Sequence, residues 1–259
     1  MEDALAILRE EQLSSALRMP VLATGYPGYD TSVGWFNYSD AQIRENCKKA
    51  MDLGFSAVKL KVGSSDGQRD IRRAGIIREV VGDGVKIMLD ANQQWTLAQA
   101  MTVCSSLVNM NPYWIEEPTH PDDIFAHQTL ARAVRPVKLA LGEHVPNRIL
   151  FKNYLQSGAV GFIQVDAVRV GGVSEFITIS LMAKKMGVPV VPHVGDMGQL
   201  HQHLVLFNHI RLGHEALFLE HIPHLKPYFV HPVQIEDGVY KTPQQPGSSC
   251  ELKEGSIYK

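Results

Sequence analysis

The stretch "AVKLKVG" (Ala57–Gly63) has the alternating pattern of a β-strand. Successive side chains of a strand point to opposite faces, so the two valines and the leucine share one face, and Lys59 and Lys61 share the other. In an amphipathic surface strand both amines would lie in water. In a protein interior, burying a lysine is costly unless the amine has a partner or a chemical role. The function of this strand therefore depends on which of its faces meets solvent.

The length and composition are those of an ordinary globular protein. The chain has 259 residues, of which 45% are hydrophobic and 20% charged, with a formal net charge of −2. It is long enough for one α/β barrel or for two smaller domains. The near-neutral charge gives no electrostatic reason to expect nucleic acid or an acidic membrane as a partner.

Cysteines and apolar runs indicate the compartment only weakly. The three cysteines are far apart and form no CxxC pair, which favours a reducing compartment and thiols that are buried or incidental. No apolar run approaches the roughly 20 residues that cross a bilayer. The acidic, helix-like start of the chain does not resemble a targeting peptide.

Eight short β-rich runs alternate with helix-like segments. The runs begin at Val21, Ser56, Val85, Tyr113, Val137, Gly161, Val188 and Ala216. One intervening segment contains a predicted capping box, formed by Ser39 and Gln42, and a predicted C-terminal cap at Gly54. Strands that alternate with helices in this way indicate parallel βα units.

Polar residues end the last seven runs at regular intervals. Successive members are 29, 26, 27, 23, 27 and 27 residues apart, and they are Lys61, Asp90, Glu116, Glu143, Asp166, His193 and Glu220. Each interval is about one βα unit, so the pattern predicts an α/β fold, a (β/α)8 TIM-type barrel over residues 1–229. A doubly wound open sheet fits less well, since it more often has five or six strands. Residues 230–259 are predicted to form an irregular tail outside the barrel, with a hairpin turn at Asp237-Gly238.

Three of these polar residues form a candidate metal site. The carboxyl ends of barrel strands converge on one mouth, and Asp90, Glu116 and Glu143 end consecutive strands, which lie about 4.8 Å apart. Three carboxylates in register suit Mg²⁺ or Mn²⁺ better than Zn²⁺. A single acid at a strand end would more often cap a helix or form a salt bridge. Glu117, the neighbour of Glu116, is expected to point to the opposite face.

A barrel reverses which face of the stretch 57–63 meets solvent, because helices cover the outside of the wall. The apolar face should then lie beneath helices, and the two lysines should face the mouth. Partial burial beside a second amine and a divalent cation lowers the pKa of a lysine toward the range of a general base. We predict Lys61 as the base, and Lys59, one layer deeper, as a positive charge for an anionic substrate.

Histidines and a further acid complete the predicted ring. Asp166 and His193 end two adjacent strands, and a carboxylate beside an imidazole fixes its tautomer and raises its basicity, as in an acid/base pair. Glu220 is expected to act as a protonated donor to a developing oxyanion. His201 and His203 lie two residues apart on an expected helix and so face different sides, which argues against a shared metal.

Three weaker features flank the ring. Asn92 could contact a substrate, although an ordinary loop turn explains it equally well. Trp35 could form a wall of the site or pack in the core. The VGG stretch at Val170–Gly172 could open a helix and bind an anion, although a plain tight turn is favoured.

The ordered set of motifs extends over nearly the whole chain. It comprises KLKVG, DANQQW, WIEEP, LGEH, VDAVRVGGV, VVPH and FLEH. In this order the motifs resemble the mandelate-racemase-like subgroup of the enolase superfamily. With YDTSVGWFNYSD after the first expected strand, they resemble the L-fuconate dehydratase group, which has a mitochondrial relative in eukaryotes.

The resemblance implies roles for the residues of the ring. One Mg²⁺ per site would be held by Asp90, Glu116 and Glu143. Lys61 would be the base and His193, paired with Asp166, the opposing acid/base group. Substrate contacts would come from Lys59, Asn92 and Glu220.

The resemblance also implies a reaction. It is the Mg²⁺-dependent dehydration of a sugar acid, here L-fuconate, to 2-keto-3-deoxy-L-fuconate, by removal of the α-proton and loss of the 3-hydroxyl. A racemase or epimerase could use the same residues. The expected partner is a small-molecule sugar acid, a homo-oligomer is compatible with the sequence, and the expected compartment is the mitochondrion, or the cytoplasm for a form without a targeting peptide.

One departure from the family pattern affects the expected activity. Family members carry an N-terminal capping domain that closes over the barrel mouth, whereas this chain begins almost at the barrel. We therefore expect a truncated or alternative form, whose tail 230–259 would lack its packing partner. Lids exclude water and complete active sites, so the alternative hypothesis is a weak or inactive form with a regulatory or interaction role.

Overall fold

Parallel strands pair in chain order to form most of the wall of a barrel. The computed structural model describes residues 18–194 and 197–256. The consecutive strands are β1 (Tyr26–Gly34), β2 (Ala57–Lys61), β3 (Lys86–Asp90), β4 (Trp114–Glu116), β5 (Lys138–Leu141) and β6 (Phe162–Ile163). β7 (Leu219–His221) pairs with β1 in parallel, so the wall returns to its first strand.

The seventh position of the wall is reduced to one bridge. Val190 pairs in parallel with Ile163, and within residues 18–194 and 197–256 no ladder joins it to β7. The prediction of an α/β fold with a parallel, TIM-type arrangement is confirmed. Hydrogen bonds leave the wall open between Val190 and β7.

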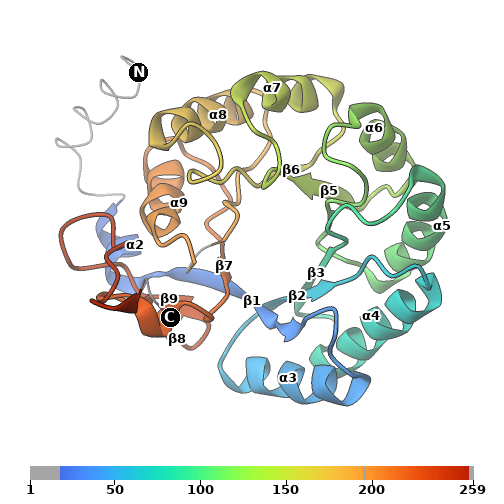
Figure 1. Ribbon diagram of the computed structural model, residues 1–259, viewed down its shortest axis with the longest axis horizontal. Coiled ribbons are helices and arrows are strands. Elements are labelled where there is room, and N and C mark those ends of the chain that lie inside the picture. Colours follow the sequence, from blue (N-terminus) through green and yellow to red (C-terminus); the bar gives the residue numbers. More distant parts are fainter. Residues whose placement is uncertain (1–17, 195–196, 257–259) are drawn as a thin grey trace.

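Helices surround the strands as an outer ring (Figure 1). They are α3 (Asp40–Asp52), α4 (Gly67–Val81), α5 (Leu97–Leu107), α6 (Ile124–Ala133), α7 (Arg148–Ser157), α8 (Val173–Lys185) and α9 (Leu200–Ile210), with short 3-10 turns at Val108–Met110 and Lys226–Tyr228. The predicted capping box of α3 is confirmed, because Ser39 and Gln42 exchange both hydrogen bonds. Gly54, with φ +80°, follows the C-terminal end of this helix. In the described residues no helix is both long and apolar enough to span a membrane.

The apolar face of β2 lies beneath the helices, as predicted. Val58, Leu60 and Val62 are buried in one core cluster with Ile43 of α3 and Ile77 of α4. Burying a side chain of this size contributes roughly 1.5–3 kcal/mol. The face that an isolated strand would turn to water, the lysine face, therefore points into the barrel.

The inside of the barrel is filled in layers. An apolar layer comprises Tyr29, Ala57, Met88, Trp114, Ala140, Phe162, Val191 and Phe218. Two positions further along the chain from each of these stand Thr31, Lys59, Asp90, Glu116, Gly142, Gln164, His193 and Glu220. Residues two apart on a strand share a face, so the apolar layer forms the floor of a polar one.

The prediction of the first strand was wrong in position. Residues 21–24 belong to a helix, α2 (Arg18–Thr24), and the strand begins at Tyr26. Gly25, with φ +81°, ends the helix in a conformation that favours glycine. The strand lies later because residues 28–34 pair with both β2 and β7.

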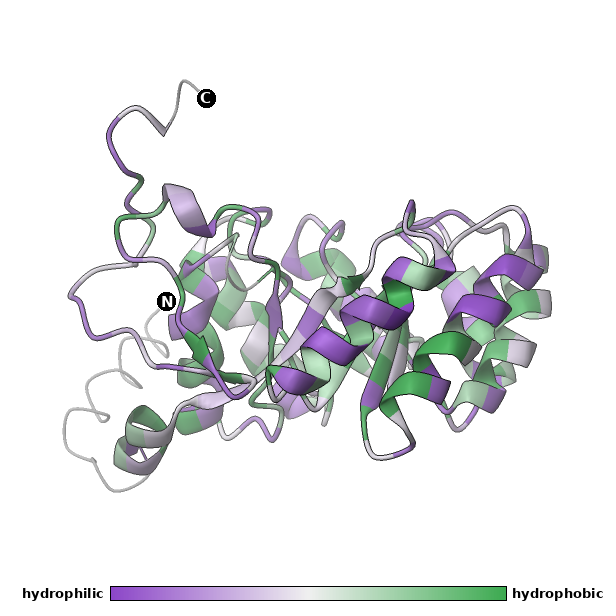
Figure 2. Ribbon diagram, turned by 90° about the horizontal axis from the view of Figure 1, so that it is seen from below, coloured by the Kyte–Doolittle hydropathy of each residue, from purple (hydrophilic) through white to green (hydrophobic). Residues whose placement is uncertain are grey.

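The tail contains the predicted hairpin. β8 (Ile235–Glu236) and β9 (Val239–Tyr240) are antiparallel, and both turn residues, Asp237 and Gly238, have positive φ. These angles are those of a type I′ turn. β9 also pairs with the start of β1, and Figure 2 shows the later part of the tail extending away from the barrel. The acidic, helix-like start of the chain lies outside the described residues.

Candidate active site

Three buried carboxylates gather at the ends of β3, β4 and β5. Asp90 pairs in register with Glu116, and Glu143 follows β5 by two residues. One oxygen atom from each lies within 4.8 Å of the other two, and Asp90 and Glu116 are fully buried. The three predicted ligands are therefore close enough, and of the right donor type, to hold one hard divalent cation.

Lys59 lies beneath this trio and balances part of its charge. The side chain is 1% exposed, and its Nζ lies 2.7 Å from Glu220, 3.0 Å from Glu116 and 3.3 Å from Asp90. Burial lowers the pKa of the amine, but the nearby carboxylates outweigh burial and raise it well above its usual value. All of its close charged contacts are protein carboxylates, which is the environment of a permanent cation.

Lys61 lies nearer the mouth, in direct contact with one of the predicted metal ligands. Its Nζ is 2.5 Å from Oδ2 of Asp90 and 5.6 Å from the centre of the Trp35 ring. Burial is the largest single influence and lowers the pKa of this lysine, but the charges of Asp90, Glu116 and Glu220 together outweigh it, so the net shift without a metal is upward. The predicted downward shift assumed a divalent cation beside the amine, so it stays a prediction for the metal-bound site.

Carboxylates of the trio have divergent pKa values. Burial and the charge of Asp90 raise the pKa of Glu116 to about 8. Burial also opposes ionisation of Glu143, but its hydrogen bond with His193 lowers the pKa to about 2. For Asp90 the two lysines outweigh burial and hold the pKa far below its usual value. A site with closely spaced negative charges resists full ionisation until a cation arrives.

His193 and Asp166 form the predicted pair on the far side of the trio. Nδ1 of His193 is 2.8 Å from Oδ2 of Asp166, and its Nε2 is 3.1 Å from Oε2 of Glu143. Burial opposes protonation of the ring, yet the two carboxylates raise its pKa to about 9. Lys61 therefore contacts the first acid of the trio and His193 contacts the last.

Glu220, which is expected to act as a protonated donor, lies beside Lys59. Burial raises its pKa, but Lys59 and His193 outweigh burial and lower it below the usual value. Its oxygens accept hydrogen bonds from the Thr31 hydroxyl at 2.6 Å and from the Val194 N–H at 3.2 Å. These bonds and the nearby Lys59 favour the ionised carboxylate in the metal-free chain, and the role as a protonated donor stays a prediction.

Glu117 does not point away from the mouth. β4 ends at Glu116, and Glu117 has φ +41°, so strand alternation no longer governs its direction. Its carboxylate lies 3.0 Å from Nδ1 of His144, and one oxygen lies within 4.8 Å of Glu143. Glu117, Glu143 and His144 thus form a second group of neighbouring donors, and residue type alone does not choose between the two sets.

The weaker candidates lie at the rim of the site. Trp35 is half-buried beside Lys61 and packs against His224 at 5.2 Å between ring centres. Asn92 is half-buried with φ +43°, and its N–H donates to Asp90 at 3.0 Å. The VGG stretch does open a helix, since Gly172 is the N-cap of α8.

Other residues at the site were missed by sequence reasoning. Arg169 contacts Glu143 at 3.3 Å and Asp166 at 3.6 Å, and His201 contacts Asp166 at 3.2 Å. Gln164 is 1% exposed, and neither of its amide atoms bonds to a described residue. Gln164 could have been found from its position two residues before Asp166 in the predicted β-rich run that begins at Gly161, where alternate residues would share a face. His201 had no such signal, because it comes from a helix.

Comparison with known proteins agrees with this arrangement. A family described as "Enolase C-terminal domain-like" matches residues 42–256. The chain belongs to the enolase superfamily. It is 42% identical to mitochondrial enolase superfamily member 1 of Homo sapiens, over 100% of this chain and 60% of that protein.

Relatives of this enolase-superfamily chain include named sugar-acid dehydratases, which are hydro-lyases. L-Galactonate dehydratase of Hypocrea jecorina is 39% identical over 100% of this chain and 59% of that protein. The crystal structure of the human member 1 superposes with a TM-score of 0.90 over 99% of this chain and 59% of that chain. L-Talarate dehydratase of Polaromonas, complexed with Mg and L-glucarate, has a TM-score of 0.80 and 30% identity, over 92% of this chain and 65% of that one. The chain thus spans about 60% of the length of the human and Hypocrea relatives.

Proposed function

We propose that this chain is the barrel part of a Mg²⁺-dependent sugar-acid dehydratase. The proposal is carried by one observation: two candidate proton carriers flank a single carboxylate trio. Lys61 contacts Asp90 at 2.5 Å, and His193 contacts Glu143 at 3.1 Å. A substrate carboxylate held at the trio would have a base on one side and an acid on the other.

The donor set supports magnesium as the cofactor. Asp90, Glu116 and Glu143 offer only oxygen atoms, which a hard divalent cation prefers. The pKa of about 8 at Glu116 reflects burial first and then the negative charge of Asp90, and a bound cation would favour the ionised form of Glu116. When bound, Mg²⁺ would orient the substrate carboxylate and stabilise the negative charge that develops on it.

The first chemical step falls to Lys61. The α C–H bond of the sugar acid breaks, its proton goes to Nζ, and the electron pair moves toward the substrate carboxylate. Nζ must be neutral for this, whereas Asp90 holds a proton on it. If Asp90 binds the cation, burial remains as the main influence on Lys61 and lowers its pKa.

The second step falls to His193. Asp166 accepts the hydrogen bond from Nδ1 and holds the ring with Nε2 directed toward the trio. A proton from Nε2 to the 3-hydroxyl lets the C3–O bond break, and water leaves. The resulting enol tautomerises to a 2-keto-3-deoxy acid, so the atoms balance without an oxidant.

Turnover of L-fuconate tests the proposal. We expect Mg²⁺-dependent formation of 2-keto-3-deoxy-L-fuconate, lowered at least about a hundredfold in Lys61→Ala. Lys48→Ala, an exposed lysine of α3, is the matched control and should keep the wild-type rate. A Lys61→Ala variant that turns over at the wild-type rate would exclude this lysine as the base.

Substitution of two adjacent glutamates, Glu116 and Glu117, tests which carboxylates hold the metal. Mg²⁺ at about 100 times its Kd should stabilise the wild-type chain by about 2.7 kcal/mol in thermal unfolding. Glu116→Gln should abolish this stabilisation, whereas Glu117→Gln should retain it. The reverse result would assign the metal to the group of Glu117, Glu143 and His144. Metal-dependent stabilisation without turnover of any sugar acid would favour the alternative, a regulatory or interaction role.

L-Fuconate is the proposed substrate among the acids that such a site could accept. The support is the resemblance of the motifs to the L-fuconate dehydratase group and the 42% identity to the human relative. A panel containing L-fuconate, L-galactonate, L-talarate and galactarate tests it by kcat/KM. Faster turnover of L-galactonate would reassign the substrate without altering the chemistry. Deuterium incorporation into recovered substrate without keto acid would instead indicate a racemase or epimerase.

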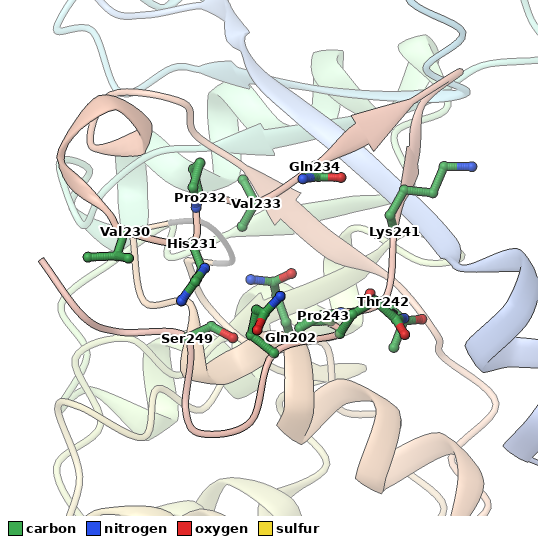
Figure 3. A pocket seen from close by; sticks show the side chains of 12 residues that line it. Gln202, Val230, His231, Pro232, Val233, Gln234, Lys241, Thr242, Pro243 and Ser249 are labelled. Atoms are coloured by element: carbon green, nitrogen blue, oxygen red, sulfur yellow. Dashed lines mark hydrogen bonds between the residues drawn. The ribbon is translucent and has the colours of Figure 1, made fainter. Parts of the chain in front are cut away.

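We also propose that the chain divides into a barrel, residues 1–229, and a tail, residues 230–259, that packs on a capping domain. Supporting this, Val230 and Leu252 are 42% and 44% exposed. The tail and α9 also line a pocket of about 220 Å³ that contains Gln202, His231 and Lys241 (Figure 3). Val230→Glu with Leu252→Glu should leave the unfolding temperature unchanged but prevent binding of the part of the human relative that this chain does not match, purified separately. Unimpaired binding would refute the packing surface.

A mitochondrial location and a homo-oligomeric state complete the proposal. The location is supported by the name of the human relative, and fractionation of cells that express the tagged protein tests it. Sedimentation of the purified chain tests the oligomeric state, and a monomer at all concentrations would refute it.

A further inference from the structure

A buried histidine outside the proposed ring reaches the loop that carries Asp166. His201 lies in the first turn of α9 and is fully buried. Its Nε2 is 2.8 Å from the backbone nitrogen of Ala167 and 3.2 Å from Oδ1 of Asp166. Its Nδ1 is 2.7 Å from the carbonyl oxygen of Gly198. The ring therefore links the loop after β6 to the segment just before α9.

The neighbours of His201 fix where its proton lies. The carbonyl of Gly198 can only accept a hydrogen bond, so Nδ1 carries the hydrogen. The backbone N–H of Ala167 can only donate, so Nε2 provides a lone pair. A neutral ring protonated on Nδ1 satisfies both backbone neighbours at once. The opposite tautomer satisfies neither of them and would instead donate to Oδ1 of Asp166 at 3.2 Å.

This link acts where the wall has few ladder hydrogen bonds. β6 has two residues, and among the described residues the one strand partner of Val190 is Ile163. Asp166 follows β6 by three residues, so its direction depends on local bonds. The N–H of Val168 donates to its Oδ1 at 2.9 Å, and the N–H of Ala167 donates to His201. One backbone donor thus binds the carboxylate whose Oδ2 meets His193, and the next one binds the ring of His201, which lies 3.2 Å from the same carboxylate.

We propose that His201 is a positioning residue for the Asp166–His193 pair. Its neutral ring holds Ala167 and Gly198 at the separation that directs Oδ2 of Asp166 toward Nδ1 of His193. The link can act only through Asp166, because it is Asp166 that meets both rings. Its effect on turnover rests on the proposed function, whereas its effect on geometry does not.

Two amide variants test the roles of the two ring nitrogens of His201 separately. The side-chain oxygen of His201→Gln can occupy the Nε2 position and accept from Ala167, and it lacks the Nδ1 donor. The amide of His201→Asn can occupy the Nδ1 position and donate to Gly198, and it does not reach Ala167. Both replace the imidazole by a neutral amide, so they differ mainly in which bond survives. His203→Gln is the matched control, since His203 lies on the same helix and contacts Ser249 in the tail at 3.2 Å.

Histidine ring NMR measures the geometry without any turnover. In the chain labelled with ¹⁵N-histidine, His201 should appear as the Nδ1–H tautomer. The Nδ1–H proton of His193, assigned by its loss in His193→Gln, should be protected from exchange with water. We expect His201→Gln and His203→Gln to keep the wild-type protection factor of this proton. In His201→Asn the protection factor should be at least about tenfold lower.

Turnover provides a second measurement if the proposed dehydration occurs. His201→Asn should lower kcat by about tenfold, at the low end of the effect of outer-shell partners in metal sites, and change KM less than twofold. His201→Gln should stay within threefold of wild type. If the wild-type chain has no turnover but the NMR differences appear, the proposed function fails and the positioning role stands.

Two results would overturn the positioning role. One is an Nε2–H tautomer of His201 in the wild-type chain, a measurement that needs no variant to fold. The other is equal protection of the His193 proton in wild type and His201→Asn, with only the unfolding temperature lowered. That second result would leave His201 as a core residue without influence on the pair.

Discussion

The two sides of the barrel wall hold their site residues by different means. In the paired half, residues 26–141, five residues of β2 pair in register with β3, and three of β3 pair with β4. In the open half, residues 162–221, β6 has two residues, the next position is one bridge, and β7 pairs with β1. Lys61, Asp90 and Glu116 belong to the paired half. Asp166, His193 and Glu220 belong to the open half.

Side-chain hydrogen bonds replace ladder bonds in the open half. His201 holds the N–H of Ala167, and Glu220 holds the N–H of Val194. Val194 has φ +48°, which is strained for a β-branched residue, and it directly follows His193. The proposed base thus sits on a regular strand, whereas the proposed acid sits on backbone that its neighbours hold in place.

The largest expected effect concerns the charge balance of the paired half. Lys59→Met removes the cation from three buried carboxylates, and breaking such a network costs about 3–5 kcal/mol. Urea unfolding without metal measures the loss, and added Mg²⁺ should recover part of it. Lys86→Met, an exposed lysine at the start of β3, should change stability by less than about 0.5 kcal/mol. Equal effects of the two substitutions would mean that the buried amine does not balance the trio.

The next effect is a pH dependence that originates in the open half. The pKa of His193 is about 9 in the folded chain and about 6.5 in an unfolded one. Its contribution to stability is therefore fully present below pH 6.5 and is lost as the pH rises through 9. This amounts to about 3 kcal/mol.

Urea unfolding of the metal-free chain at pH 6 to 9.5 measures this contribution. His193→Gln should reduce the decline, leaving the share of Glu116, whose raised pKa of about 8 falls in the same range, whereas the exposed His231→Gln should leave the decline unchanged. A decline of undiminished size in His193→Gln would assign it to other groups.

Hydrogen exchange compares the two halves directly. The amides of Leu60 and Leu89 lie in the β2–β3 ladder, and those of Ile163 and Val191 bond across the single bridge. Amides with fewer cooperative neighbours open at lower free energy. We expect exchange at least about tenfold faster for Ile163 and Val191, a difference of about 1.4 kcal/mol in opening free energy. Equal protection factors by NMR would contradict the division into halves.

The smallest expected effect involves two surface ion pairs that each join successive outer helices. Arg44–Glu79 joins α3 to α4 in the paired half. Arg148–Glu175 lies between α7 and α8, and there Glu175 is 8% exposed and also accepts from the backbone of Arg148 at 2.7 Å. Double-mutant cycles in urea should give the larger coupling for the second pair, since charge-assisted bonds strengthen with burial. A larger coupling for Arg44–Glu79 would mean that the open half gains nothing from its outer helices.

Much of the fold could be predicted because its sequence signals either repeat at regular intervals or depend on a few adjacent residues. The regular spacing of polar strand ends predicted the α/β barrel, and strand alternation predicted that the lysines of β2 share a face. The capping box of α3 and the turn at Asp237-Gly238 depend on a few adjacent residues, so both could be predicted. The first strand was misplaced because residues 21–24 carry apolar side chains that suit a helix equally well.

The sequence predicted most residues of the candidate site, but it did not predict the charges that they carry. The sequence named Asp90, Glu116 and Glu143, and the structure brings them within reach of one ion. It did not indicate that Glu117 would turn back toward His144, because a left-handed φ ended the alternation. It gave no signal for His201, whose contact with Asp166 joins residues 35 positions apart.

By itself, the sequence determined which side chains stand at the ends of the strands, because strand alternation and the βα repeat are properties of consecutive residues. Only the tertiary structure decided what charge each of these side chains carries. The pKa of Lys61 depends on Asp90, 29 residues away, and that of His193 on Asp166 and Glu143. Charge interactions act through space, so they depend on distances that only the assembled strands and helices set.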